Sequence, residues 1–465
     1  MAFLERNANR GSISTGYDID NSMKCQANSG NEWFYRDNPT AGNRQTFTFS
    51  FWLKRTQVAG YEADNYLMSQ GSNARFHFAG HTLRFMFDGN STELEAAGKL
   101  RDCAAWYHIV LAVDTTQGTN TNRVKAYVNG AQYEFNNNDW PSQNATSDWM
   151  NTNDMYFNTR DGDGSYDNSG YWAEIAVVDG QQLAPTDFGE YNDDGVWVPK
   201  DLSDITWGNE GFWWNFSNSS SLGEDSSGNN NTATFNNLTT ADLATDTPTN
   251  NFCTLNPLVN FKYGTNGGGM TQGATVYGDD TGGGVGGAFG TFAVTKGKWY
   301  WEMKLTQQVA HYPGISAVDD GDNIYTSSDP QEENSTFNYN ISAARREYVS
   351  GGSLTYGSLD EMSDFHSTGD IISIALNMDD NQISIYGNGT LQSGIANSSI
   401  FDAANKMVVP FHGTINDEVQ YNFGGYSVWT PSSAESDANG YGTFEYAPPS
   451  GYYALCTKNL SEFGG

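Results

Sequence analysis

The longest apolar segments of this chain repeat with a period of two residues, which is the period of a β-strand. The segment 46–54, TFTFSFWLK, alternates polar and aromatic residues, and the segment 106–114, WYHIVLAVD, is almost wholly apolar but has the length of a strand. Side chains at alternate positions of a strand point to opposite faces of its sheet. No segment shows a convincing helical period over more than two or three turns. The pattern predicts an all-β fold.

Asn-Gly pairs mark the turns between these segments. The alternating residues 124–128 run into Asn129-Gly130 and continue as another alternating segment, and residues 382–386 run into a Gly-Asn-Gly turn at 387–389. An Asn-Gly pair joins neighbouring strands tightly because both residues tolerate a positive φ. The chain also holds 51 Gly but only 12 Pro, as expected of many short turns. We therefore expect antiparallel sheets built from hairpins.

The same succession of strands occurs twice along the 465 residues. An apolar strand, an acidic turn, an alternating strand and an Asn-Gly pair follow one another at 106–130 and again at 370–389. Between these regions, residues 217–256 are rich in Ser, Asn, Thr, Gly and Asp and poor in large apolar residues. We predict two tandem antiparallel β-sandwiches of jelly-roll type, at 1–216 and 257–465, joined by a polar linker at 217–256.

The net charge restricts the partners of the chain. It sums to −32 at neutral pH, from 23 Lys and Arg against 55 Asp and Glu. A protein that binds a phosphate backbone needs a basic surface, and an anionic membrane surface repels a chain of this charge. No apolar segment approaches the ~18 residues of a membrane span. We expect neither a nucleic-acid nor a membrane partner.

The sequence lacks the common patterns of catalytic residues. Alternation places Glu174 opposite Ile175 and Val177, so we expect a solvated or edge carboxylate at this position. No G-x-S-x-G motif accompanies the scattered histidines, and His108 lies in a core strand, where a hydrogen-bonded buried imidazole is expected. The four cysteines stand far apart, which argues against a zinc or redox motif and favours thiols. We therefore expect no catalytic residue.

The segment 161–167, DGDGSYD, carries oxygen-bearing side chains at every second position. It is no EF-hand, because it lacks the glycine at the sixth position and the glutamate at the twelfth, where Trp172 stands. The spacing still suits an irregular calcium loop, with an acidic turn between strands as the alternative. The candidate metal ligands are Asp161, Asp163, Ser165 and Asp167.

Three aromatic residues lie in polar segments rather than in strand patterns: Trp140, Trp149 and Tyr166. Aromatic rings can stack on the apolar faces of sugars, whereas strand tryptophans such as Trp52 are expected in the core. Trp140, Trp149 and Tyr166 are therefore candidate glycan-binding residues. For the two tryptophans, packing against the sandwich is the alternative.

Two series of motifs resemble known families. The first half resembles the laminin-G/pentraxin branch of the concanavalin A-like jelly rolls through FSFWLK at 49–54, WYHIV at 106–110, VKAYVNG at 124–130 and AEIAVVDGQQL at 173–183. The second half resembles a SPRY-like domain through WYWE at 299–302, GDII at 369–372, IYGNG at 385–389 and YNFG at 421–424. Laminarinase-type enzymes of this superfamily carry Glu-x-Asp-x-x-Glu, and the nearest candidate, at 174–179, lacks the central Asp and the second Glu.

Segments outside these motifs are similar to lectin-like virion proteins of marine bacteriophages: GVWVPK at 195–200, DSSGN at 225–229, DTPTNNF at 246–252 and GYYALCT at 451–457. This resemblance implies a non-catalytic protein of the virion surface, in a tail fibre or capsid appendage, that binds host cell-surface glycans. A capsid decoration protein that only holds neighbouring subunits is the alternative, and a polysaccharide-degrading enzyme is a further one. Jelly-roll lectins often hold loop calcium, so calcium is the cofactor expected.

The resemblance also implies other virion proteins and a host surface polysaccharide as partners. A homo-oligomer is expected on separate grounds. In soluble β-sandwich proteins, lysines, prolines or bulges on the edge strands prevent pairing with strands of other chains. This chain has few lysines and only 12 prolines for two sandwiches.

Overall fold

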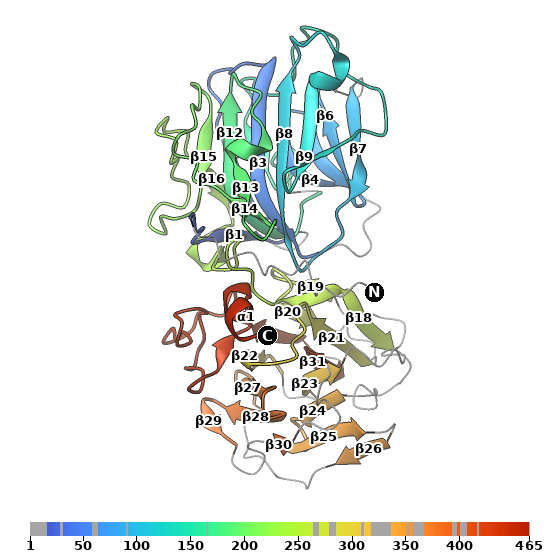
Figure 1. The fold of residues 1–465 in the computed structure, drawn as a ribbon, viewed down its shortest axis with the longest axis vertical. Helices are drawn as coiled ribbons and strands as arrows, with labels where there is room; N and C mark the ends of the chain where they lie inside the picture. Colours follow the sequence, from blue (N-terminus) through green and yellow to red (C-terminus); the bar gives the residue numbers. More distant parts are fainter. Residues whose placement is uncertain are drawn as a thin grey trace. The chain divides into compact units, whose positions relative to one another are not determined.

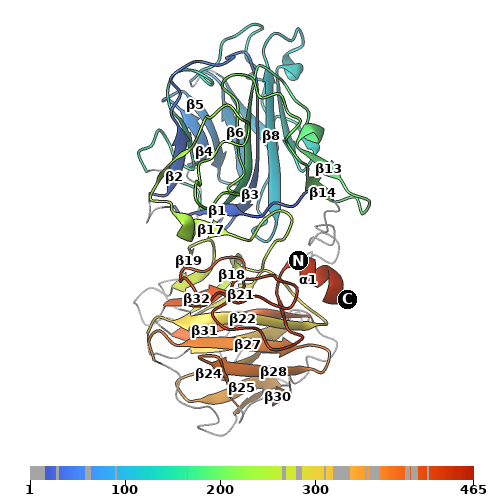
Figure 2. The ribbon, with the colours of Figure 1, turned by 90° about the vertical axis from the view of Figure 1, so that its left-hand side faces the viewer.

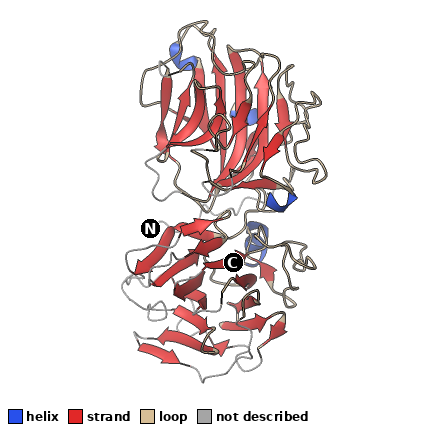
Figure 3. Ribbon diagram, turned by 180° about the vertical axis from the view of Figure 1, so that it is seen from behind, coloured by secondary structure: helices blue, strands red, loops and turns tan. Residues whose placement is uncertain are grey.

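A computed structural model describes residues 16–27, 31–57, 64–89, 92–164, 166–263, 269–278, 285–307, 311–317, 336–350, 353–356, 367–392, 398–399, 407–415 and 418–464. The chain divides into two compact units, Met1–Asn250 and Asn251–Gly465. Each unit contains two large sheets whose strands are almost all antiparallel (Figures 1 and 3), and the first unit has a two-stranded sheet as well. The all-β prediction is therefore confirmed.

The first unit contains an eight-stranded and a seven-stranded sheet. In spatial order the eight-stranded sheet holds β10 (Ala131–Tyr133), β9 (Val124–Val128), β8 (Trp106–Asp114), β3 (Thr46–Arg55), β12 (Gly170–Asp179), β1 (Ser22–Cys25) and β17 (Leu243–Ala244), and β15 (Phe212–Trp214) pairs with β12. The seven-stranded sheet holds β16 (Thr234–Asn236), β2 (Trp33–Arg36), β11 (Met155–Phe157), β4 (Asp64–Gln70), β5 (Ala74–Ala79), β6 (Thr82–Met86) and β7 (Glu93–Lys99). The remaining elements are the hairpin β13 (Gly189–Tyr191) and β14 (Trp197–Pro199) and the 3₁₀ turns η1 (Asn120–Asn122), η2 (Pro185–Asp187) and η3 (Thr240–Asp242).

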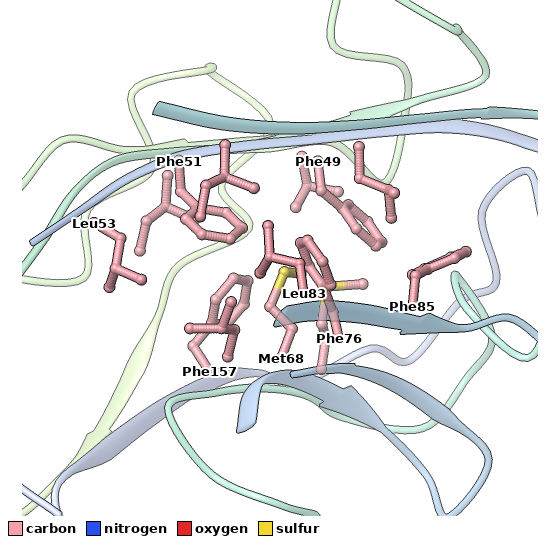
Figure 4. Packing of buried hydrophobic residues seen from close by; sticks show 14 of the residues in the cluster. Phe49, Phe51, Leu53, Met68, Phe76, Leu83, Phe85 and Phe157 are labelled. Atoms are coloured by element: carbon pink, nitrogen blue, oxygen red, sulfur yellow. The ribbon is translucent and has the colours of Figure 1, made fainter. Parts of the chain in front are cut away.

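Alternate residues of the facing strands fill the space between these sheets (Figure 4). Phe49, Phe51 and Leu53, at every second position of β3, point toward the seven-stranded sheet. That sheet contributes the opposite layer of the core, which includes Met68, Phe76, Leu83, Phe85 and Phe157. Burying each such side chain contributes about 1.5–3 kcal/mol. The residues between them point to the outer faces of the sheets.

The outer faces of the two sheets differ. Val110, Ala176 and Val178 on the eight-stranded sheet are buried beneath residues of the segment 183–213, including Phe188 and Trp213. The outer face of the seven-stranded sheet instead carries polar and aromatic side chains. Trp33, Tyr35 and Tyr156 on this second face are only partly buried.

Residues 217–250 differ from the polar linker predicted at 217–256. Strand β16 pairs with β2, and β17 pairs with β1, so this segment completes an edge of each sheet in the first unit. Its threonines form buried hydrogen bonds, such as that from the Thr249 hydroxyl to the carbonyl of Ile19 (3.2 Å). The boundary between the units therefore falls after Asn250, rather than at 216 and 257.

The second unit contains a seven-stranded and a nine-stranded sheet (Figure 2). The seven-stranded sheet holds β18 (Leu255–Tyr263), β21 (Val285–Gly290), β31 (Val408–Ile415), β23 (His311–Ala317), β24 (Thr336–Asn340), β25 (Arg345–Ser350) and β26 (Ser353–Tyr356). The nine-stranded sheet holds β19 (Gly269–Thr271), β20 (Val276–Gly278), β32 (Glu418–Asn422), β22 (Lys298–Leu305), β27 (Ile371–Asn377), β28 (Gln382–Gly387) and β29 (Thr390–Leu391), with β30 (Ser398–Ser399) beside β28 and β33 (Tyr453–Ala454) parallel to β22.

The helix α1 (Thr457–Phe463) has seven residues. Within the part of the chain that the structure describes, no helix has the length and apolar character needed to cross a membrane. All four cysteines of the chain are buried thiols, in agreement with their scattered positions in the sequence.

Candidate functional site

The structure separates the three aromatic residues predicted to bind glycans. Trp149 is a core residue with no exposed surface, and its indole Nε1 donates a hydrogen bond to the carbonyl of Met86 (2.9 Å). Trp140 is half-buried and packs edge-on against Phe135, with ring centroids 5.3 Å apart. Tyr166 is 44 % exposed. The prediction for Trp149 is therefore corrected, because its polar segment folds back and inserts the ring between the sheets.

Three aromatic side chains that the sequence analysis did not select lie together on the outer face of the seven-stranded sheet. Trp33 and Tyr35 of β2 and Tyr156 of β11 are partly exposed, and their ring centroids lie 5.4–5.6 Å apart. Alternation explains this placement, because Phe34 and Phe157 of the same strands point into the core. We call Trp33, Tyr35 and Tyr156 the aromatic face.

The loop after β11 holds the aromatic face in place. Gly162 has a φ of +71°, and a Cβ at this position would lie 2.6 Å from the ring of Tyr156, so only glycine fits against the ring. The Tyr156 hydroxyl donates to Oδ2 of Asp154 (3.2 Å). Burial, reinforced by Asp154, raises the pKa of Tyr156 to about 12, so its hydroxyl stays protonated at neutral pH.

Tyr166 follows in the same loop and borders the same sheet. Its ring lies 5.6 Å from that of the buried Tyr66, and the guanidinium of Arg160 lies 5.6 Å from the Tyr166 ring centroid. Tyr66 in turn stacks on His77 of β5 at 5.2 Å. Aromatic and cationic groups thus continue along the outer face from β2 toward β5.

Two carboxylates lie on β7, at the far edge of the seven-stranded sheet. Glu93 and Glu95 stand two residues apart and so point to the same side of the sheet. Paired carboxylates of this kind are what a glycosidase requires, and the sequence analysis missed them. Both bind the guanidinium of Arg84, at 3.3 Å from Glu93 and 2.8 Å from Glu95. The pair is therefore engaged in an ion-pair network at the sheet edge.

Glu174 of β12 is buried, contrary to the expectation of a solvated or edge carboxylate. A β-bulge lies between Ala173 and Ala176, and Glu174 itself has a φ of +48°. Its side chain lies on the face opposite the core residues Ile175 and Val177, and it is buried because Tyr17 and Trp213 cover that face. Its carboxylate accepts hydrogen bonds from the Tyr17 hydroxyl (3.0 Å) and from Nε1 of Trp213 (2.6 Å). Burial raises the pKa of Glu174 to about 7.

His108 and Ser50 have the spacing of a base and a nucleophile but the wrong protonation. Oγ of Ser50 lies 2.9 Å from Nε2 of His108, while Nε1 of Trp197 donates to Nδ1 (3.0 Å). Nδ1 therefore carries no proton, Nε2 carries it, and the serine oxygen accepts. Burial lowers the pKa of His108 to about 3, which keeps the ring neutral. A general base must face the hydroxyl with an unprotonated nitrogen, so this pair is structural.

The acidic loop contains the predicted calcium ligands Asp161, Asp163 and Asp167, whereas Ser165 lies outside the described residues. Asp167 is buried without an ion-pair partner among the described residues, and a hydrogen bond from Thr159 only partly offsets the effect of burial on its pKa; Oδ1 of Asp161 is also buried. Burial raises the pKa of Asp167 to about 6. Over the described ranges, no three His, Cys, Asp or Glu side chains are grouped to hold a metal. A cation here would need hydroxyl or carbonyl oxygens as well.

Residues 8–180 match the family model described as the concanavalin A-like lectin/glucanases superfamily. Among solved structures, the SPRY domain of human HERC1 is similar, with 17 % identity, coverage of 36 % of this chain and 96 % of that domain, and a TM-score of 0.26. A Bacteroides ovatus protein whose name proposes carbohydrate binding is 15 % identical over 48 % of this chain and 60 % of its own, with a TM-score of 0.34. No curated protein matches the sequence.

Proposed function

We propose that this protein is a non-catalytic carbohydrate-binding protein and that its first unit binds a glycan chain on the aromatic face. The observation that carries the proposal is the row of three partly exposed rings, Trp33, Tyr35 and Tyr156, on the open sheet of a concanavalin A-like domain. Aromatic rings supply an apolar platform with polar tips, which suits a ligand that has apolar C–H faces and hydroxyl rims. Asp154 beside Tyr156 and Arg160 beside Tyr166 are hydrogen-bonding groups for such hydroxyls.

The double substitution Trp33→Ala/Tyr35→Ala is expected to weaken glycan binding by about tenfold or more, because stacking on two rings is lost. Retardation of the full chain in native gels that contain polysaccharides measures this effect. Tyr191→Ala is the matched control, since Tyr191 is 56 % exposed but lies on the β13–β14 hairpin. Equal retardation of the wild type and the double variant contradicts the proposal.

The same samples are expected to release no reducing sugar. Both carboxylates of the Glu93 and Glu95 pair bind Arg84, and the Ser50–His108 pair has the wrong tautomer for a nucleophile. Release of sugar by the wild type that is abolished in Glu93→Gln would identify an enzyme instead.

We also propose calcium as a ligand of the acidic loop, held by Asp167 together with hydroxyl and carbonyl oxygens. The buried carboxylate of Asp167, which has no ion-pair partner among the described residues, supports this proposal, because a buried charge needs a counter-charge. Calcium is expected to raise the unfolding midpoint of the wild type in a thermal scan relative to a chelator. Asp167→Asn should abolish this shift and raise the midpoint of the calcium-free protein. A wild-type midpoint that ignores calcium contradicts the proposal.

The biological setting we propose is the surface of a marine bacteriophage virion, in a tail fibre or capsid appendage. Other virion proteins and further copies of the chain would be its partners, and host surface polysaccharide its ligand. The similarity of the segments at 195–200 and 451–457 to phage lectin-like proteins supports this setting, and a net charge of −32 keeps crowded copies soluble. Immunogold labelling of phage particles tests it, and particles without label would contradict it. A decoration protein would label the capsid but bind no glycan.

A further inference from the structure

The second unit carries its own group of half-exposed tyrosines. Tyr386 of β28 and Tyr452 pack against one buried cluster, formed by Phe252, Tyr300, Ala375, Phe444, Ala454 and Cys456. Tyr446 lies over the turn that follows β28, since a Cβ on Gly389 would meet its ring at 2.6 Å. The C-terminal segment that supplies Tyr446 and Tyr452 lies beside β22 and β27 in both views (Figures 1 and 2).

Buried carboxylates fix the backbone that presents these rings. Glu302 of β22 accepts hydrogen bonds from the backbone N–H groups of Glu445 and Tyr446, both at 2.9 Å. Asp437 accepts the N–H of Ala454 at 2.9 Å, two residues after Tyr452. The tyrosines are thus held on a rigid sheet face before any ligand arrives, which reduces the entropy lost on binding.

Hydrogen-bonding groups surround the rings. Asn388 donates to Oδ1 of Asp370 (2.9 Å), and Asn377 donates to Oδ2 of Asp380 (2.8 Å). Asp370 lies close enough to Tyr446, and Asp380 to Tyr452, that each contributes to the raised pKa of its tyrosine, although burial is the main cause. The two amides thus orient the carboxylates of Asp370 and Asp380 at the ends of β27 and β28.

We propose that Tyr386, Tyr446 and Tyr452, together with Asp370, Asp380 and Asn388, form a second saccharide-binding surface whose ligand is an uncharged glycan. The rings offer platforms for the C–H faces of sugars, and the carboxylates and the amide offer partners for sugar hydroxyls. The carboxylates of Asp370, Asp380 and Glu445, within a chain of net charge −32, repel sulfated or uronic-acid polymers. This site lies in the second unit and goes beyond the proposed function of the first.

The test uses the full chain in the Trp33→Ala/Tyr35→Ala background, which removes the aromatic face of the first unit. The probes are neutral glucans, mannans, xylans and galactans, alginate as the anionic polymer, and polylysine as a basic peptide. We expect this background to retain binding to a neutral polymer and to ignore alginate. Adding Tyr446→Ala/Tyr452→Ala should weaken the binding by about tenfold, whereas Tyr446→Phe/Tyr452→Phe, which keeps the stacking rings, should weaken it far less.

The outcomes separate the two proposals. Loss of all binding in the Trp33→Ala/Tyr35→Ala background overturns the second surface and leaves the first. Binding unaffected by that background but lost on adding Tyr446→Ala/Tyr452→Ala overturns the first surface and supports the second. Wild-type protein that binds none of the neutral polymers overturns the second surface, and wild-type protein that binds neither these nor alginate overturns both. Binding of polylysine alone by the background variant would assign the tyrosine surface to a basic protein partner and overturn this inference.

Discussion

Lys54→Met is expected to lower the free energy of unfolding of the first unit by about 3–5 kcal/mol, because it leaves a buried carboxylate without its counter-charge. Nζ of Lys54 lies 2.6 Å from Oδ2 of Asp246, and the two side chains are 0 % and 1 % exposed. Nε1 of Trp106 donates to the other oxygen of Asp246 (3.0 Å). Asp246 lies in the segment that was predicted as a linker, and these two contacts bind it to Lys54 of β3 and Trp106 of β8.

Chemical denaturation of the variant, followed through the transition of the first unit, measures this loss. The double variant Lys54→Met/Asp246→Leu should recover most of the stability, because an apolar pair can replace a buried ion pair. Arg44→Ala is the control: its pair with Asp148 is about one-third exposed, so its loss should cost only ~0–1 kcal/mol. Equal effects of Lys54→Met and Arg44→Ala would contradict the prediction.

Glu174→Gln is expected to remove a pH dependence from the stability of the first unit. The folded-state pKa of Glu174 is about 7, above its ordinary value of 4.5, so the folded chain binds the extra proton between these values. The stabilisation from this group is complete below about pH 4.5 and is lost as the pH rises through about 7, in total about 3 kcal/mol. Glutamine resembles the protonated carboxyl, because it can donate toward Tyr17 and accept from Trp213.

Denaturation at intervals from pH 5 to pH 8 checks this expectation. As the pH rises across this range, the free energy of unfolding of the wild type should fall relative to that of Glu174→Gln, by about 3 kcal/mol in total. Two curves that run parallel would show that the Glu174 carboxyl titrates alike in the folded and unfolded states.

Much of the strand framework could be predicted, because local chemistry determines it. Asn129-Gly130 was predicted to turn between strands, and Asn129 and Gly130 indeed have φ values of +49° and +77°. Asn388 and Gly389 have almost the same φ values, +47° and +77°. The turns depend on residues that tolerate positive φ, and such residues are visible in one sequence without any knowledge of the fold.

Features that depend on distant partners could not be predicted. The burial of Glu174 depends on Tyr17 and on the segment 183–213, which cover its face of the sheet, and nothing in the segment 170–179 indicates this cover. The segment 234–236 was predicted to be part of a linker because its composition is polar. Its backbone instead pairs with β2, about 200 residues earlier in the chain. A polar composition does not prevent edge pairing, since the backbone supplies the hydrogen bonds.

The aromatic face was missed for a related reason. Trp33, Phe34 and Tyr35 are aromatic on both sides of one strand, so alternation alone does not show which side faces the core. Only pairing with β11 brings Tyr156 beside Tyr35 and buries Phe34 against Phe157. The prediction for Trp149 was wrong in the opposite direction. Its polar neighbours indicated an exposed ring, whereas the ring is part of the core.

Hydroxyl-radical footprinting of the full chain, with and without a polysaccharide whose gels retard it, tests whether a glycan covers the aromatic face. Radicals oxidise exposed aromatic side chains, and a bound glycan shields those that it covers. We expect protection of Trp33, Tyr35 and Tyr156, with the oxidation of Tyr191 unchanged. Unchanged oxidation of the three rings in the presence of a saturating, bound polysaccharide would contradict this expectation.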